Sequence, residues 1–260
     1  MRVLCPYRVF ITIFVLFLMP QFILPQEMSK DKLYFMHEEA ARIDKIDEYN
    51  QSAKDFTKMF ADMKLDVPAI YASETDDFHF FYLVPINNYA DVDKLNSAFN
   101  DVFSKADKDK TAKTMKEGDE STVYIRDFVL KRSDELSYKS EKQKLDMSKE
   151  IFLHEDFFTY KPEYRKQIMQ LGADYKKLNQ DKGVEDSYDV WMPDLGEKNN
   201  LIVVITMAKD ATSYYQQQDK DNTLLGKEGD ALWNKMLTML ENFNHLNAHT
   251  RPDLSYMKSK

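Results

Sequence analysis

The sequence of 260 residues contains few of the residues on which several kinds of protein chemistry depend. It has one cysteine, Cys5, and six glycines. Cys5 precedes an apolar run, so a chain cut after that run would carry no thiol, which excludes disulfides, thiolate zinc sites and cysteine catalysis. The scarcity of glycine argues against a phosphate-binding loop, and no dinucleotide fingerprint, nucleophile elbow or HExxH zinc motif is present.

The first 26 residues differ in character from the rest. Arg2 and Arg8 precede the uncharged run 9–19, and two prolines follow it. This pattern predicts a secretory signal peptide over residues 1–26, because the run is too short for a comfortable membrane span. The small-residue cleavage site is poor, so an uncleaved N-terminal anchor is the alternative. We therefore expect an exported protein, periplasmic or secreted, or else one anchored by its N-terminus.

Acidic side chains outnumber basic ones, 44 to 36, which gives a net charge of −8. Loss of residues 1–26 would remove two arginines and no acid and bring the charge to −10. An acidic protein of this kind is a poor candidate for binding nucleic acids or anionic membranes. Hydrophobic residues make up 43% of the chain, enough to build a folded core.

The sequence repeats itself over a unit of about 110 residues. Four pairs of segments match in the same order: 28–30 with 147–149, 37–39 (His-Glu-Glu) with 154–156 (His-Glu-Asp), 107–119 with 219–230, and 132–138 with 251–256. We therefore expect two equivalent units, residues 28–139 and 147–257, joined by a charged linker over residues 140–146.

Hydrophobic periodicity gives each unit the same order of elements. In the first unit it predicts strands at 33–37, 69–73, 78–86 and 135–139, helices at 41–64, from 90 and at 119–131, and a charged loop at 105–116. In the second it predicts strands at 151–154, 188–192, 201–207 and 253–257, with helices at 162–179 and 228–248. This βαββαβ order is the ferredoxin-like motif.

The third strand of each unit is apolar on both faces, at 78–84 and 201–205. Such a strand belongs to a sheet that is covered on both sides. In a ferredoxin-like unit the helices cover only one face, so we expect the two bare faces to pack against each other. The sequence predicts an α+β protein of two tandem ferredoxin-like units packed sheet to sheet. Because the duplication supplies the second unit, we expect a monomer.

The tandem unit resembles the dimeric α/β-barrel superfamily, in which two ferredoxin-like units pack sheet to sheet. The matching features are the turn at 224–229 (Leu-Leu-Gly-Lys-Glu-Gly) and the closing segment 251–256 (Arg-Pro-Asp-Leu-Ser-Tyr). The resemblance covers residues 28–257 and implies an intrachain pseudo-dimeric α/β barrel. Members of the superfamily include stress-responsive proteins, antibiotic-biosynthesis-type monooxygenases and chlorite-dismutase-like haem proteins. More narrowly, the chain is similar to exported proteins that carry this unit in tandem, and a fold with so many chemistries does not assign a function.

His37 and His154 are the first candidate site residues, since each ends the first strand of its unit and is followed by two acids. They could act as a general base or as metal ligands. The alternative is a histidine bonded to a neighbouring group and repeated because the unit was duplicated. No third ligand accompanies them or the pair His245 and His249, so we expect no metal site.

His79 shares a strand face with Phe81 and Leu83, so it could anchor a ligand between the two sheets. Aromatic side chains in the strands could line the same cavity, or could equally belong to the core: Tyr71, Tyr82, Tyr188 and Trp191.

Two repeated polar motifs have structural interpretations. Lys-Glu-Gly-Asp, at 116–119 and 227–230, is expected to form a turn before a helix. Asp-Lys-Asp, at 107–109 and 219–221, resembles a fragment of a calcium loop without its glycine and closing glutamate, and we expect a solvated loop.

Four functions remain open. The leading hypothesis is an exported protein, more a binding protein than an enzyme, that holds a small apolar molecule or an envelope partner between its units and needs no cofactor. The second is a cofactor-free monooxygenase for an aromatic substrate, whose oxygen uptake would depend on His79 or His37. The third is haem binding through His154 or His245. The fourth is a purely structural interaction module.

Overall fold

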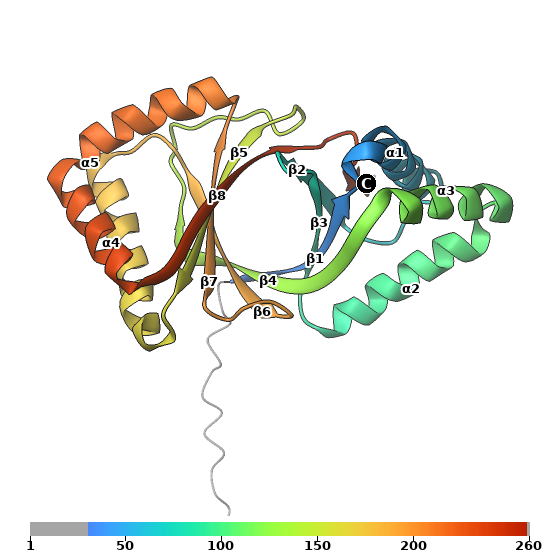
Figure 1. Cartoon of the computed structure of the whole chain (residues 1–260), viewed down its shortest axis with the longest axis horizontal. Coiled ribbons are helices and arrows are strands. Elements are labelled where there is room, and N and C mark those ends of the chain that lie inside the picture. Colours follow the sequence, from blue (N-terminus) through green and yellow to red (C-terminus); the bar gives the residue numbers. More distant parts are fainter. Residues whose placement is uncertain (1–30, 259–260) are drawn as a thin grey trace, which may run out of the picture.

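The computed structural model describes residues 31–258, whose strands form a closed antiparallel barrel with helices outside it (Figure 1). The strands are β1 (Lys32–Ala41), β2 (Ala69–Thr75), β3 (His79–Ile86), β4 (Thr122–Tyr138), β5 (Phe152–Tyr160), β6 (Tyr188–Leu195), β7 (Leu201–Ala208), β8 (Leu240–Thr250) and the short β9 (Tyr256–Met257). The helices are α1 (Ile46–Asp62), α2 (Ala90–Lys105), α3 (Lys108–Ser121), α4 (Arg165–Lys182) and α5 (Ala211–Met239), with short 3₁₀ turns at Ile43–Lys45 and Pro162–Tyr164.

The barrel is closed by the pairing of β2 with β3. Around it the strands follow the order β3-β1-β4-β6-β7-β5-β8-β2, and every pair is antiparallel. Each half contributes four consecutive strands, in the orders β4-β1-β3-β2 and β8-β5-β7-β6. The halves therefore meet at two seams, β4 with β6 and β8 with β2, and β9 continues the second seam.

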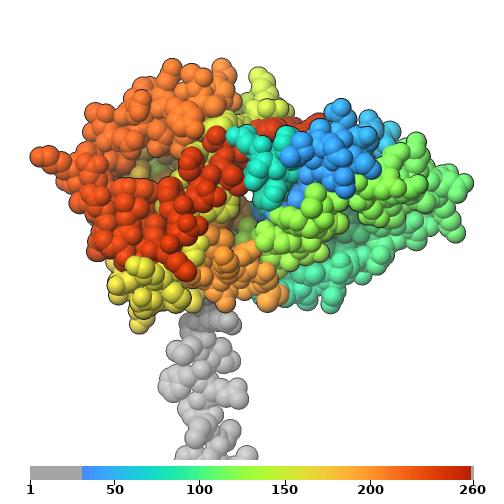
Figure 2. Space-filling view, viewed as in Figure 1, coloured from blue at the N-terminus to red at the C-terminus, as the bar shows by residue number. Residues whose placement is uncertain are grey.

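Helices cover the outside of the barrel on two opposite sides. Figure 1 shows α1, α2 and α3 against the first half and α4 and α5 against the second. In the space-filling view the halves form two lobes, and the red residues of β8 lie beside the cyan residues of β2 where the lobes meet (Figure 2). Each lobe has a hydrophobic core of its own between sheet and helices, around Leu65 in the first and Leu171 in the second.

A third apolar cluster fills the barrel and joins the halves. Met36 and Leu130 come from the first half, and Trp191 and Val203 from the second. Strand residues alternate between this cluster and the helix-facing cores, so Phe80 is fully buried beneath the helices while Phe81 packs inside. The expected α+β barrel, with strands covered on both faces, is confirmed.

The four-stranded sheets of the two halves contact each other along their edge strands as well as through their inner faces. β4 runs for 17 residues and pairs with both β1 and β6. An unpaired strand edge exposes a row of backbone donors and acceptors, and the two seams satisfy them. Polar contacts also connect the two halves at the second seam. Arg251 forms ion pairs with Glu74 and Asp253, and its backbone N–H donates a hydrogen bond to the Ala72 carbonyl oxygen.

Three expected elements are wrong. Residues 105–116, expected as a charged loop, fall mostly in α3, which Asp107 caps by accepting a hydrogen bond from the Lys110 N–H. Residues 119–131, expected as a helix, are mostly β4. The helix expected at 228–248 ends at Met239, and its last residues form β8, while β9 covers only part of the strand expected at 253–257.

The repeated polar motifs are helical as well. Residues 219–221 lie within α5, not in a solvated loop. The first Lys-Glu-Gly-Asp motif falls near the end of α3, and the second falls in the middle of α5, directly after Gly226. A Cβ on Gly118 would lie 3.0 Å from the Ser52 hydroxyl oxygen, so glycine permits the close approach of α3 to α1. Gly226, with φ of 52°, kinks α5.

The signal peptide expected over residues 1–26 lies outside the described residues. Within residues 31–258, no helix is long and apolar enough to cross a membrane.

Candidate functional site

The repeated histidine motif occupies equivalent positions in the two halves. His37 on β1 lies opposite Asp127 on β4, and His154 on β5 lies opposite Asn247 on β8. The histidine Nδ1 is 2.7 Å from Oδ1 of Asp127 in the first half and 2.9 Å from Oδ1 of Asn247 in the second. The duplication therefore preserves a three-dimensional contact as well as a sequence.

The other ring nitrogen of each histidine faces an acid two residues further along. Nε2 of His37 is 3.0 Å from Oε1 of Glu39, and Nε2 of His154 is 3.4 Å from Oδ1 of Asp156. Burial alone would lower the pKa of both histidines, but the hydrogen bonds and negative charges of their neighbours outweigh it and raise each pKa. His37 is thus held between two carboxylates, which favour its protonated form.

A cavity of about 400 Å³ lies beside His37, between the sheet of the first half and its helices. Its polar end is formed by His37, Glu39, Tyr49 and Tyr82. The Tyr49 hydroxyl donates to the Glu39 carboxylate and is 3.1 Å from the Tyr82 hydroxyl. Phenylalanines dominate the rest of the wall: Phe35, Phe56, Phe60, Phe99 and Phe103. The cavity therefore offers a partly buried carboxylate at one end and aromatic rings at the other.

The two tyrosines at the polar end remain protonated. Burial, followed by neighbouring negative charge, raises the pKa of both Tyr49 and Tyr82 well above that of an ordinary phenol. They therefore keep their hydroxyl protons at neutral pH, and Tyr49 donates its own to Glu39.

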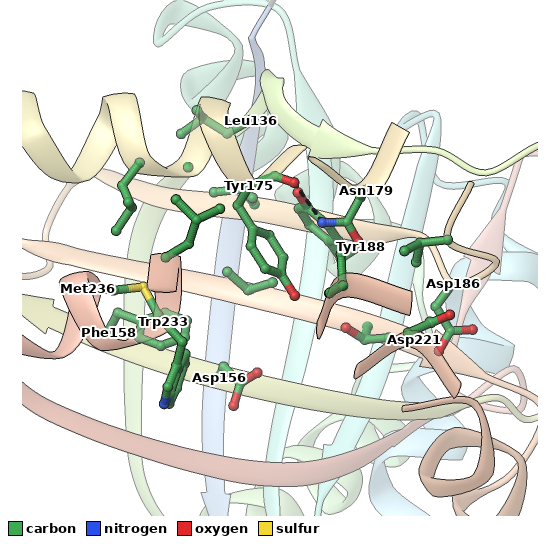
Figure 3. Close-up of a pocket in the computed structure, with 18 of the residues that line it drawn as sticks. Leu136, Asp156, Phe158, Tyr175, Asn179, Asp186, Tyr188, Asp221, Trp233 and Met236 are labelled. Carbon is green, nitrogen blue, oxygen red and sulfur yellow. Dashed lines mark hydrogen bonds between the residues drawn. The ribbon is translucent and has the colours of Figure 1, made fainter. Parts of the chain in front are cut away.

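The second half has an equivalent cavity of about 180 Å³, between its sheet and helices α4 and α5. Figure 3 shows that Phe158, Trp233 and Met236 lie at one end and that Asp186 and Asp221 lie together at the other. This cavity therefore also has an apolar end and a polar end, but its polar end is made of two acids.

Three buried polar atoms of this second cavity have no hydrogen-bond partner: Oδ2 of Asp186, Oδ2 of Asp221 and the Tyr188 hydroxyl. Leaving such a group buried and unpaired costs about 1–3 kcal/mol. Burial, and next the charge of Asp221, raises the pKa of Asp186 to about 7, and burial also raises the pKa of Asp221. The polar end is therefore incompletely satisfied by the protein itself.

The seven candidate residues named from the sequence do not form a single site, and one of them, Tyr188, lines the cavity of the second half. His37 and Tyr82 share the cavity of the first half. His154 is buried against the Tyr214 ring, 4.7 Å between ring centroids. Trp191 belongs to the barrel interior, where it packs against Tyr34, and Tyr71 is about half exposed.

His79 also faces the barrel interior, where other polar side chains surround it. Its Nδ1 is 3.0 Å from Oε1 of the buried Glu38, which also accepts hydrogen bonds from Tyr124 and Arg126. His79 therefore does not stand on an apolar wall, because Glu38 and Arg126 reach the same face from neighbouring strands. His79 completes a polar network and lines neither cavity.

Both cavities lie within a half, between sheet and helices, whereas the sequence led us to expect one between the units. The cavity residues that sequence reasoning missed are Glu39, Tyr49, Asp127, Asp186 and Asp221. Glu39 could have been predicted from the sequence, since it belongs to the repeated His-Glu-Glu motif. The others depend on strand register and helix packing that the local pattern does not show.

Glu155 is the counterpart of Glu38, and its carboxyl has no hydrogen-bond partner within residues 31–258. Burial, and next the charge of Asp77, raises its pKa to about 7. The folded state therefore binds this proton more tightly than the unfolded state, and stability falls as the pH rises from about 4.5 to 7. We expect Glu155→Gln to match the wild type at pH 5 and to exceed its free energy of unfolding at pH 8 by about 3 kcal/mol.

Urea denaturation of both proteins at pH 5 and pH 8 tests this prediction. Glu241→Gln, on an exposed position of β8, is the matched control and should follow the wild type at both pH values. An identical pH dependence of wild type and Glu155→Gln would contradict it.

Comparison with known proteins finds matches among solved structures alone. No protein-family model matches the sequence, and neither does any curated protein. An anthrone oxidase-like protein has a TM-score of 0.58 at 10% identity, covering 85% of this chain and 91% of that one. A proposed monooxygenase from Fusobacterium nucleatum gives 0.55 at 12% identity, covering 84% and 92%. A mutant chlorite dismutase from Candidatus Nitrospira defluvii gives 0.50 at 8% identity, covering 85% and 92%.

Identities this low show a shared fold and not a shared chemistry. These neighbours belong to the dimeric α/β-barrel superfamily, and the chain has the fold of that superfamily.

Proposed function

We propose that the chain binds a small, mainly aromatic molecule with one polar group in the cavity of the first half. The observation that carries this proposal is the pairing, in one cavity, of a phenylalanine-lined wall with the Glu39 carboxylate and the Tyr49 hydroxyl. A mostly apolar cavity with a few convergent polar groups is the usual form of a small-molecule site.

The two ends of the cavity would contribute differently to binding. An aromatic ring buried among the phenylalanines gains about 25 cal/mol for each Å² of apolar surface removed from water. A phenol or enol at the other end could donate to Glu39 or accept from Tyr82. The apolar end would therefore supply most of the affinity, and the polar end would fix the orientation.

Two wider expectations remain part of the proposal. Each half has the strand order β4-β1-β3-β2 or its equivalent, which supports two ferredoxin-like units in tandem. The sequence of residues 1–26 supports export, so the ligand would be met in the periplasm or outside the cell.

Binding of 2-naphthol, followed by calorimetry, tests the proposal. We expect the wild type to bind it and Glu39→Gln to bind it about tenfold more weakly, because a hydrogen bond to a charged acceptor is worth about 1.5–3 kcal/mol. Asp44→Asn, an exposed acid near the start of α1, is the control and should leave binding unchanged. Failure of the wild type to bind, or equal binding by Glu39→Gln, would contradict the proposal.

The second candidate is a cofactor-free oxygenase acting in the same cavity. It is favoured by the Glu39 carboxylate, which places a base at the polar end, and by His37, which holds that carboxylate in position; the named activities of two structural neighbours are consistent with it. The base would remove a proton from a methylene group activated by flanking rings, and the carbanion would transfer its electrons to O₂. The balance is CH₂ + O₂ → C=O + H₂O, with O₂ as the oxidant.

Oxygen uptake with anthrone as the substrate tests this second candidate. The sequence proposed His37 and His79 as catalytic candidates, and of these two only His37 lines the cavity. We expect His37→Ala to abolish uptake and His79→Ala to retain it in the folded fraction. No uptake by the wild type would leave binding as the function, and equal loss in both variants would contradict the role of His37.

Haem does not fit the residues present. The cavity of the second half has no histidine in its lining, and both ring nitrogens of His37 face carboxylates. His154 is held by Asn247 and Asp156, and His245 is exposed. No described histidine therefore directs a free ring nitrogen into a cavity.

A further inference from the structure

We propose that the cavity of the second half is a separate binding site for a small organic ammonium ion with an aromatic body. The proposal stands apart from the ligand of the first half, because a different set of residues carries it. It begins with the acid pair at the polar end, where Oδ2 of Asp186 and Oδ2 of Asp221 are buried and have no hydrogen-bond partner.

The acids are aimed into the cavity and are not solvated surface groups. Only about 3% of Asp221 and 9% of Asp186 is exposed, and Figure 3 shows their carboxylates together at one end. Their other oxygens already have partners: Oδ1 of Asp221 accepts from Gln217 at 2.9 Å and Oδ1 of Asp186 from Gln143 at 3.3 Å. Oδ2 of each acid is thus the oxygen left without a side-chain partner.

The duplication supplies an independent comparison. In the repeated Asp-Lys-Asp motif, Asp109 of the first half is the counterpart of Asp221. Asp109 is exposed on α3, whereas Asp221 is buried on α5. The kink at Gly226 lets residues on both sides of it, Asp221 and Trp233, line the same cavity. The second half therefore buries an acid at a position whose counterpart in the first half is exposed.

Within residues 31–258, no positively charged side chain lines the cavity beside these acids. The cavity lining contains Asp156, Asp186 and Asp221 and no lysine, arginine or histidine. The other titratable groups that face it are tyrosines: Tyr175, Tyr188 and Tyr214. The charge of Glu185 adds to the negative potential at Asp186. Together these groups favour a cation.

The geometry favours an organic cation over a metal ion. Within residues 31–258, no group of three or more histidine, cysteine or acidic residues is arranged to hold a metal. The other end of the cavity is apolar, with Phe158, Trp233 and Met236, and aromatic faces attract cations as well as rings. The cavity volume of about 180 Å³ exceeds the roughly 150 Å³ of an apolar cavity that binds benzene. One ring with a short ammonium arm is the matching ligand.

Protonation of the acids sets the conditions for the test. Burial, and next the charge of Asp221, raises the pKa of Asp186 to about 7. At pH 8 the Asp186 carboxyl is therefore mostly an anion, whereas at pH 5.5 it holds its proton. An ammonium ligand should bind more tightly at the higher pH, while a neutral ligand of the same shape should not.

The experiment compares benzylamine with benzyl alcohol by calorimetry at pH 8. We expect the amine to bind the wild type at least tenfold more tightly than the alcohol, a preference that falls at pH 5.5. Asp221→Asn should remove the preference. Asp219→Asn, which deletes the same charge from an exposed position two residues earlier on α5, should retain it.

Two further variants complete the design. Asp186→Asn tests the other acid, so the proposal remains falsifiable where Asp221→Asn does not fold. Ala53→Phe, which obstructs the cavity of the first half, should leave amine binding unchanged and so place it in the second half. The proposal would be overturned if the wild type bound amine and alcohol equally, or if the preference for the amine survived in both acid variants. The two acids would then be a buried carboxyl pair without a ligand.

Discussion

Replacing Arg126 by alanine is expected to lower the free energy of unfolding by about 3 kcal/mol, the lower end of the range for breaking a buried ion pair. Arg126 donates to the Glu38 carboxylate from Nε, at 2.9 Å, and from a terminal nitrogen. Only about 1% of Glu38 is exposed, so its charge would stay buried after the substitution. Tyr124 and His79 would still donate to it, and for this reason we expect the lower figure.

Arg126 also reaches across a seam of the barrel. One of its terminal nitrogens is 3.0 Å from Oε2 of Glu197, which lies in the other half. Its guanidinium is half exposed, so this second contact contributes little by itself. The main cost of the substitution thus comes from Glu38, and Glu38→Gln added to Arg126→Ala should recover part of the lost stability.

Urea denaturation at pH 7 measures the effect. Arg42→Ala is the control, because Arg42 pairs with Asp44 and both side chains are exposed, so its loss should cost less than about 1 kcal/mol. Similar losses in the two variants would contradict a special role for the Glu38 network, as would the absence of any recovery in the double variant.

The Glu38 network illustrates which parts of the fold the sequence predicts. Alternation along β1 and β3 places residues on one face or the other, and the expected strands at 69–73, 188–192 and 201–207 lie within observed ones. Alternation does not say which face becomes the inside of a barrel. That depends on how the two sheets close into a barrel. The sequence could therefore place His79 and Trp191 on a strand face, but could not say whether that face packs against helices or lines the barrel interior.

Two of the wrongly predicted elements, now β4 and β8, share a physical cause. Leu232, Met236, Leu240 and Phe243 recur at helical spacing, but the helix ends at Met239. The following residues pair with β5 and, over Ala248–Thr250, with β2, a strand more than 170 positions away in the chain. Similarly, β4 becomes a strand because it pairs with β1 and β6. Non-local pairing overrides the local pattern at both seams.

The candidate site could be predicted in part. The repeated motif contains both His37 and Glu39, which share one strand face because they are two residues apart. Asp127 becomes their neighbour only through the register of β1 with β4, 90 positions along the chain. The phenylalanine wall comes from helices α1 and α2 and from β1, and no short segment of sequence brings these together.

Ala53→Phe is expected to reduce the affinity for 2-naphthol by roughly 100-fold. Ala53 lies on α1 and lines the cavity of the first half beside Phe56. An added ring at this position would occupy the space that the ligand ring needs. Losing the burial of one aromatic ring removes about 3 kcal/mol, which corresponds to that factor in Kd.

The same substitution should not destabilise the protein, and this separates obstruction of the cavity from misfolding. Filling empty space restores contacts that the cavity walls lack, so the melting temperature should equal or exceed that of the wild type. Ala61→Phe places the same side chain on an exposed position of α1 and should bind 2-naphthol normally. Full binding by a folded Ala53→Phe would move the aromatic ligand out of this cavity, whereas weak binding by both variants would point to a general effect on the helix.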